Sequence, residues 1–175
     1  MAHAHLANHY NDGMLALRYA AVLAIAVWVG GLIVLGGIAA PAIFEVAGTR
    51  HIEEGRLLAG AIFGEILRRF HLVSYACGGI VAASLAARAV LGPRPRRFAV
   101  RLVVALLMLG ASAYSGLVVS RRIASLQQTM QVAPSSLPES DPRRIEFGRL
   151  HGTSTGLQLV PIVGGLLLLF WELRD

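Results

Sequence analysis

Four long apolar runs, separated by polar or charged segments, dominate the pattern of hydrophobic and polar positions along the chain. They cover about residues 14–40, 70–91, 98–119 and 150–171. At 1.5 Å per residue, each run is long enough to cross the ~30 Å hydrocarbon core of a bilayer as a helix. The pattern therefore predicts an all-α, integral membrane four-helix up-and-down bundle, formed by a single membrane domain over residues 14–175.

The segments between the runs predict how the spans are connected. Residues 1–13 form a polar tail containing His3, His5 and His9. Pro41 is expected to end or kink the first span. Over Ile52–Arg69, apolar residues recur at helical spacing among charged ones, which predicts an amphipathic surface helix between spans one and two. Residues 92–97 form a tight basic connection, and residues 123–141 are expected to be irregular.

Composition narrows the class of protein. Hydrophobic residues make up 55% of the 175 residues and charged residues only 15%, which is typical of a chain embedded in the lipid bilayer. The basic residues are all arginines in short clusters beside apolar runs, which argues against nucleic acid as a partner. A single cysteine, Cys77, excludes an internal disulfide. No serine or cysteine has an identifiable base and oxyanion hole in its context, so an enzyme is not indicated.

Four spans place both chain ends on the same side of the membrane. The short connection over residues 92–97 carries three arginines and no acidic residue. The positive-inside rule weights such short loops, and it predicts cytoplasmic termini in a bacterial cytoplasmic membrane. More arginines in total lie on the other side, so a plain count favours the opposite orientation.

Two histidines provide the candidate chemistry. His71 begins span two and His151 begins span four, and both spans enter the membrane from the same face, so the imidazoles should lie at similar depth. Each histidine is followed, three and four residues later, by polar residues: Ser74 and Tyr75 in span two, Ser154 and Thr155 in span four. Polar stripes of membrane helices face the bundle interior. Both histidines are therefore expected to point inward.

A haem b group between the histidines is the first hypothesis. In a square bundle, spans two and four are diagonal, with axes roughly 11–14 Å apart. Two imidazoles at that separation suit a flat cofactor, and axial histidine is a standard haem ligand. Arg68 and Arg149 would stand at the rim, where haem propionates emerge. This site would indicate membrane electron transfer or haem handling.

Several alternatives remain open. His71 and His151 could hold copper or another metal, with outer ligands drawn from Glu45, His51, Glu65 and Glu146. They could also serve as structural hydrogen-bonding groups, or take part in proton or small-solute transport. Small residues on the helix faces suggest a non-catalytic accessory subunit packing in a larger membrane complex, or a homo-oligomer. These small residues are Gly30, Gly31, Gly36, Gly37, Ser112, Gly116 and Ser120.

A family resemblance rests on two glycine-rich segments. They are GGLIVLGGIAAPAIFEVAG at residues 30–48 and FGRLHGTSTGLQLVPIVGGLLLL at residues 147–169. The chain resembles the transmembrane protein 205-like family of four-span proteins of unknown function, which is distantly similar to copper-resistance protein D. The matching positions are Gly30, Gly31, Pro41, Phe44 and the Leu150–His151 pair. The resemblance implies a four-helix membrane domain and an association with metal tolerance, and it transfers no catalytic residue.

Overall fold

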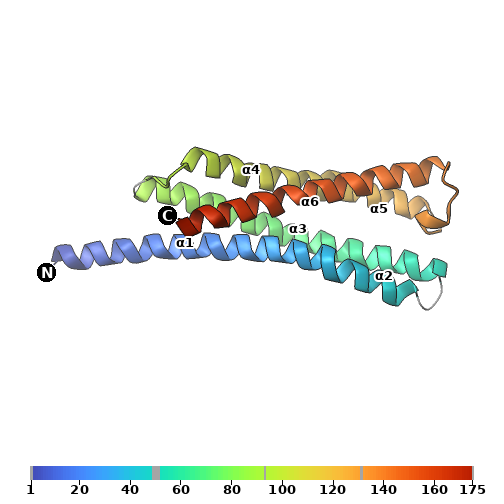
Figure 1. Ribbon diagram of the computed structural model, residues 1–175, viewed down its shortest axis with the longest axis horizontal. Coiled ribbons are helices and arrows are strands. Elements are labelled where there is room, and N and C mark those ends of the chain that lie inside the picture. Colours follow the sequence, from blue (N-terminus) through green and yellow to red (C-terminus); the bar gives the residue numbers. More distant parts are fainter. Residues whose placement is uncertain (1, 49–51, 93, 131, 175) are drawn as a thin grey trace.

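Four helical rods lie side by side in the computed structural model, which describes residues 2–48, 52–92, 94–130 and 132–174 (Figure 1). The first rod is α1 (Ala2–Val34), η1 (Leu35–Ala39) and α2 (Ala40–Gly48), and the second is α3 (Ile52–Leu91). The third is α4 (Phe98–Tyr114), η2 (Ser115–Val119) and α5 (Ser120–Thr129). A short 3₁₀ turn, η3 (Pro134–Ser136), leads to the fourth rod, α6 (Pro142–Arg174).

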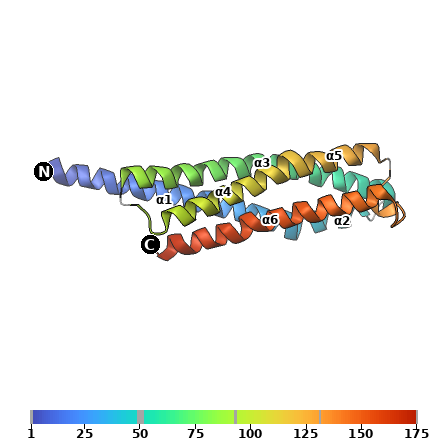
Figure 2. The ribbon, with the colours of Figure 1, turned by 90° about the horizontal axis from the view of Figure 1, so that it is seen from above.

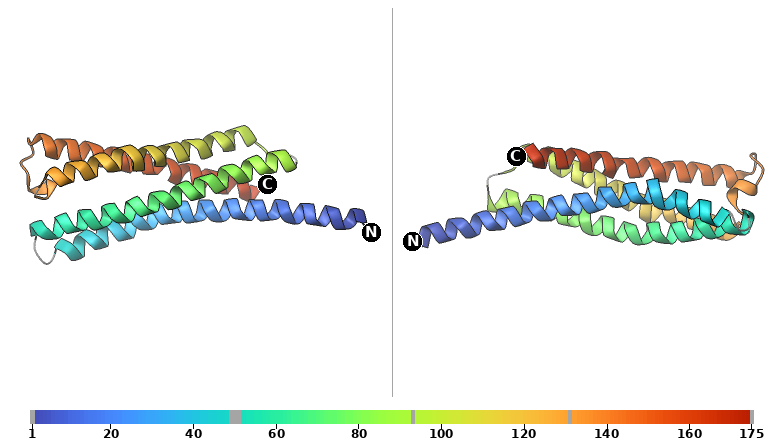
Figure 3. Two further views of the ribbon diagram at one scale, coloured as in Figure 1. Left: turned by 180° about the vertical axis from the view of Figure 1, so that it is seen from behind. Right: turned by 60° about the horizontal axis from the view of Figure 1, so that its bottom comes forward.

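The rods form a square, antiparallel bundle. Helix α1 packs against α3 and α6, and α4 packs against the same two helices, so α3 and α6 occupy diagonal positions (Figures 2 and 3). The C-terminal end of α6 lies beside the short connection between α3 and α4, whereas α2, α5 and η3 lie at the opposite end. The predicted all-α four-helix bundle is confirmed, as is the diagonal placement of spans two and four.

The four rods are longer than the predicted spans. The segments long and apolar enough to cross a membrane are Asp12–Gly48, Glu54–Leu91, Phe98–Thr129 and Pro142–Arg174, of 32 to 38 residues. The chain is therefore an integral membrane protein. At 1.5 Å per residue these helices reach about 48–57 Å, which exceeds the ~30 Å hydrocarbon core. The surplus length must be taken up by tilt or by helix ends that stand outside the hydrocarbon.

The first rod does not end at Pro41, where the sequence predicts that the helix either ends or kinks. The backbone stays in the right-handed helical region at Val34 and Ala40, on either side of η1, a five-residue π-helical turn. Proline has no N–H to donate and its ring crowds the preceding turn, and a wider π turn just before it relieves both conflicts. The helix consequently continues to Gly48.

The connecting segments are more helical than expected. Residues 2–13, predicted as a polar tail, belong to α1. The amphipathic segment Ile52–Arg69 forms and continues without a break into span two as one 40-residue helix. Residues 123–129, predicted to be irregular, belong to α5 because η2 carries span three onward in the helical conformation. The irregular part of this connection therefore shrinks to the region around η3.

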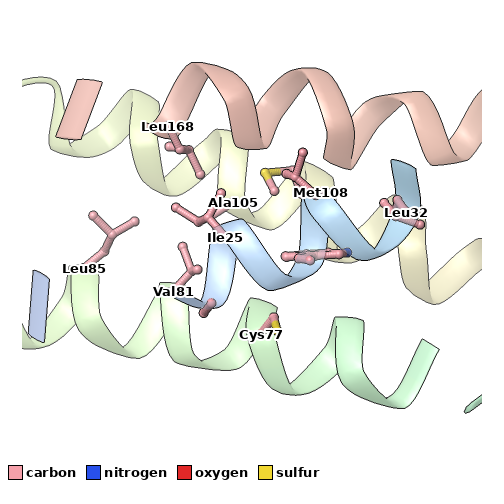
Figure 4. Packing of buried hydrophobic residues seen from close by; sticks show 11 residues of the cluster. Ile25, Leu32, Cys77, Val81, Leu85, Ala105, Met108 and Leu168 are labelled. Carbon is pink, nitrogen blue, oxygen red and sulfur yellow. The ribbon is translucent and has the colours of Figure 1, made fainter. Parts of the chain in front are cut away.

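The centre of the bundle is a closely packed apolar core. Trp28 of α1 and Met108 of α4 are fully buried, and Ile25 and Val81 are almost fully buried beside them. Figure 4 shows how labelled core residues from the four rods converge, with Leu168 of α6 above Ile25 and Cys77 of α3 below. Since lipid supplies no hydrophobic drive for helix association, close van der Waals contact holds such a core together.

Glycines bring particular helix pairs into contact. A β-carbon at Gly78 would lie 2.7 Å from Leu109 Cδ1 and 3.1 Å from Trp28 Cη2, so α3 can approach only without a side chain there. Gly31 similarly faces the Phe70 ring. Gly30, Gly36 and Gly37, which were grouped with Gly31 as packing residues, have no neighbour within 4 Å of a β-carbon. Among these four glycines, Gly31 alone has a side chain of another helix within 4 Å of its β-carbon position.

Candidate functional site

His71 lies midway along α3, buried against the third rod. Its side chain is 5% exposed, and Nε2 lies 3.5 Å from the Ser120 hydroxyl oxygen. Its ring stacks with Tyr75 at a centroid distance of 6.1 Å. Opposite stands Gly116 of η2, where a β-carbon would lie 2.8 Å from His71 Cγ. The imidazole is thus held between one turn of its own helix and the π-helical turn of its neighbour.

Buried hydroxyl groups extend this polar region towards α6. The hydroxyls of Ser115 in η2 and Ser154 in α6 lie 3.4 Å apart, and both side chains are buried. Ser74 and Ser112 are buried as well. π-Helical turns are often found at functional sites, and this one places Ser115 towards α6 while Gly116 accommodates His71. The predicted inward direction is therefore correct for His71, Ser74 and Ser154.

His151 points away from this region. Its side chain is exposed, and its ring stacks with Phe147 of the same helix at a centroid distance of 6.0 Å. The buried face of α6 is formed instead by Leu150, Ser154, Pro161, Gly165, Leu168 and Glu172. The expectation that His151 faces inward is therefore wrong, because this row of apolar and small residues, one position away, determines which side of α6 meets the bundle.

The two predicted rim arginines do not converge on the histidines either. Arg68 is exposed and binds Glu65 through two hydrogen bonds, of 2.7 and 2.8 Å, and Arg69 binds the same carboxylate. Arg149 is exposed on α6. The residues His71, His151, Arg68 and Arg149 thus occupy separate surroundings. Within one chain, these four residues do not converge on a single site.

A metal ion needs several donor side chains close together. Across the described ranges, no three side chains of His, Cys, Asp or Glu come close enough together to hold a metal ion. His51, one of the proposed copper ligands, lies outside the described residues, as do the side chains of His3, His5 and His9. Haem b and copper binding stay predictions from the sequence.

A second polar cluster, at the end of the bundle that carries the C-terminal end of α6, centres on Glu172. Its Oε1 accepts hydrogen bonds from Arg88 Nη1 at 2.9 Å and from Arg101 Nη1 at 2.8 Å. Arg18 Nε lies 3.3 Å from Oε2, and Arg18 also donates to the Glu172 carbonyl oxygen. Glu172, Arg88 and Arg101 are all at least nine-tenths buried. One carboxylate therefore ties α1, α3 and α4 to α6.

This cluster was missed from the sequence. A usable signal was present. Each apolar run carries an ionisable residue near one end: Arg18 early in span one, Arg88 late in span two, Arg101 early in span three and Glu172 late in span four. In an up-and-down bundle these positions share one level, and ionisable groups inside spans usually pair with one another.

Comparison with known proteins adds the family. Residues 23–131, more than half of the chain, match a family described as a domain of unknown function (DUF4149). No curated protein and no solved structure matched the chain. The matched range includes His71, Arg88 and Arg101 and ends before α6. The chain is therefore a member of the DUF4149 family, whose biochemical role is uncharacterised.

Proposed function

We propose that this protein is a non-catalytic helical subunit of a larger membrane complex, joined to another membrane helix through the outer face of α6. The observation that supports this docking is a glycine stripe formed by Gly148, Gly152 and Gly156. The three residues recur every four positions, all are exposed, and a β-carbon at any of them would meet nothing within 4 Å. The stripe is thus a flat strip of exposed backbone.

Small residues at four-residue spacing suit close contact between membrane helices. They let two backbones approach, which gains van der Waals contact where the lipid gives no hydrophobic drive. The neighbouring polar groups support the same role. Thr153 and Thr155 donate to the carbonyl oxygens of Arg149 and His151 in their own helix, at 2.8 and 3.0 Å. Their hydroxyl groups therefore place no unsatisfied hydrogen bond on this face.

An apolar groove continues the stripe along α6. It lies between α4 and α6, encloses about 380 Å³, and is lined by Val104, Leu107, Met108, Leu159, Val160, Val163, Gly164 and Leu167. Leu159 stands three residues beyond Gly156, so groove and stripe follow one another on the outside of the same helix. A partner helix on the stripe could place apolar side chains in this groove, which would extend the contact.

The other functions suggested by the sequence remain predictions with their own test. An absorption spectrum and a metal analysis of the purified chain would detect haem b or copper. A Soret band lost in a His71→Ala, His151→Ala double variant would support electron transfer or haem handling. The resemblance to the transmembrane protein 205-like family, with its association with metal tolerance, also remains a prediction.

Co-isolation of the full chain from its native membranes in a mild detergent tests the proposal. We expect a partner membrane protein in stoichiometric amount with the natural sequence, and its loss when Gly148, Gly152 and Gly156 are each changed to Ile. Matched controls are Gly79→Ile on α3 and Gly110→Ile on α4, which are also exposed glycines without a neighbour. Both controls should retain the partner.

Three results would contradict the proposal. One is a natural chain that is isolated alone and monodisperse under conditions that preserve other membrane complexes. Another is a stripe variant that retains its partner as well as the two controls do. Recovery of a second copy of the chain, lost in the stripe variant, would show that the stripe serves a homo-oligomer, and the larger complex would then be excluded.

A further inference from the structure

We propose that the end of the bundle that carries the C-terminal end of α6 binds a phosphate-bearing anion in an arginine pocket. The pocket, defined by Arg96, Arg97, Arg101, Trp171 and Arg174, encloses about 210 Å³. It joins the connection between α3 and α4 to the last turn of α6. The inference is independent of the proposed docking through the glycine stripe, which lies on another part of the molecule.

The balance of charge favours an anion. Arg18, Arg88 and Arg101 already share Glu172, and Arg96, Arg97 and Arg174 bring three more positive charges to the same end. Within the part of the chain that the structure describes, no carboxylate pairs with Arg96, Arg97 or Arg174. Asp175, which follows Arg174 in the sequence, lies outside the described residues. Among the described residues of the cluster and the pocket, six arginines are therefore accompanied by one carboxylate, that of Glu172.

Aromatic rings position two of the pocket guanidinium groups. Arg97 Cζ stands 5.9 Å from the centroid of the Trp171 ring, and Arg174 Cζ stands 5.3 Å from that of Phe170. Such cation–π contacts hold a guanidinium group by one face and leave its N–H edge free to bind an anion. A guanidinium group presents paired N–H donors that match two phosphate oxygens, whereas an ammonium group acts as a simple point charge.

The backbone at the rim of the pocket is unusual. Arg97 adopts φ 57° and ψ 32°, the one positive φ among the non-glycine residues that the structure describes. The left-handed region is unfavourable for a side chain of this kind, and such strain is concentrated at ligand-binding sites. Here it turns the chain from the short connection into α4 and places Arg97 over Trp171. The strain thus helps to form the pocket.

The surroundings place the pocket at the membrane surface. Val90, Leu91 and Phe170 are exposed apolar residues at this end of the bundle, beside the arginines. Tryptophan and arginine are typical of the level where lipid headgroups lie, and basic pockets between membrane helices bind anionic headgroups. The phosphate group could therefore belong to an anionic phospholipid or to a free phosphate ion, and both present the same oxygen atoms.

Thermal unfolding of the full chain in a neutral detergent tests the pocket. The probes are short-chain phosphatidylglycerol, short-chain phosphatidylcholine and inorganic phosphate, each added to the natural sequence and to an Arg96→Gln, Arg97→Gln, Arg174→Gln variant. We expect phosphatidylglycerol or phosphate to raise Tm, and the triple variant to lose about 100-fold in apparent affinity. The matched control is Arg94→Gln, which changes an exposed arginine of the same connection outside the pocket and should keep the apparent affinity.

The three probes separate the two sources of phosphate. A rise in Tm with phosphatidylglycerol alone identifies a lipid headgroup. An additional rise with inorganic phosphate identifies a free anion. Either result supports the pocket if the Arg94→Gln variant shows the same rise in Tm. Absence of any response, an equal loss in Arg94→Gln, or an equal response to phosphatidylcholine overturns the proposal. If the triple variant does not fold, Arg174→Gln alone replaces it. A glycine-stripe variant should bind the anion normally.

Discussion

The two faces of α6 both carry glycine, but the surroundings of the glycines differ between the faces. The buried face carries Gly165 and ends in Glu172, whose carboxylate binds arginines from three other rods. The outer face carries Gly148, Gly152 and Gly156, where an added β-carbon would meet no described residue within 4 Å. A glycine on the first face is explained by its neighbours. The glycines on the second face have no such explanation within one chain, and this difference underlies the proposed docking surface.

The largest effect is expected from Glu172 on the buried face. Glu172→Gln removes the charge that compensates Arg88 and Arg101 inside the bundle, while it nearly preserves the shape of the side chain. Breaking one member of a buried ion pair costs about 3–5 kcal/mol, so the chain should unfold much more readily in a denaturing detergent. Glu146→Gln, exposed on the same helix, should change the unfolding free energy by less than about 0.5 kcal/mol.

A pair of glycine variants compares the two faces directly. A β-carbon at Gly165 would meet Val29 Cγ2 and lie 3.2 Å from Ile25 Cγ2, whereas one at Gly156 would meet nothing. Gly165→Val should therefore lower the free energy of unfolding of the isolated chain by about 1–3 kcal/mol. Gly156→Val should leave that free energy almost unchanged. Equal stability of the two variants would remove the distinction between the faces.

A smaller effect is expected from the serine pair. The Ser115 and Ser154 hydroxyls join η2 to α6, and hydrogen bonds between membrane helices are worth about 0.6 kcal/mol on average. Ser154→Ala should lower the unfolding free energy by about that amount. Thr155→Ala removes a hydroxyl that bonds within α6, so the contact between helices should be unaffected. If Thr155→Ala costs as much as Ser154→Ala, the assignment of the inward face is contradicted.

The smallest effect is expected where α6 begins. Hydrogen bonds from the Arg143 side chain and backbone N–H lower the pKa of Asp141 from 3.8 to about 2. Because the folded pKa lies below the unfolded one, Asp141 stabilises the fold fully above the unfolded value, and this contribution is lost as pH falls towards 2. Thermal unfolding in a non-ionic detergent, measured between about pH 5 and 2, should show this loss in the natural chain and a weaker pH dependence in Asp141→Asn.

The fold could be predicted because long apolar runs have few alternatives in a membrane. The four spans and their antiparallel order followed from run length, and the inward direction of His71 followed from the polar residues three and four positions after it. The direction of His151 could not be predicted, because both faces of α6 carry glycine, leucine and small hydroxyl residues, and the hydropathy of these residues gives little preference. The rods are longer than the predicted spans because η1 and η2 carry the helices past Pro41, where an end or a kink was expected, and past Val119, where the third apolar run ends.

The Glu172 cluster joins residues that lie far apart in the sequence but at the same end of their spans. Glu172 lies 154 residues from Arg18, 84 from Arg88 and 71 from Arg101 along the chain. No local motif therefore joins them. Counting residues from the shared end of each span would have placed them at one level. What sequence counting could not supply is the rotation of each helix, which decides that these four side chains face one another.

The glycine stripe of α6 is tested most directly by crosslinking in intact membranes. A photo-reactive side chain placed at Thr155, beside the stripe, should give a protein–protein product, and the same group at Gly110, exposed on α4, should not. The product should disappear when Gly148, Gly152 and Gly156 are changed to Ile. A chain that gives no protein product from Thr155, or the same product from Gly110, would contradict the assignment of the outer face of α6 as the docking surface.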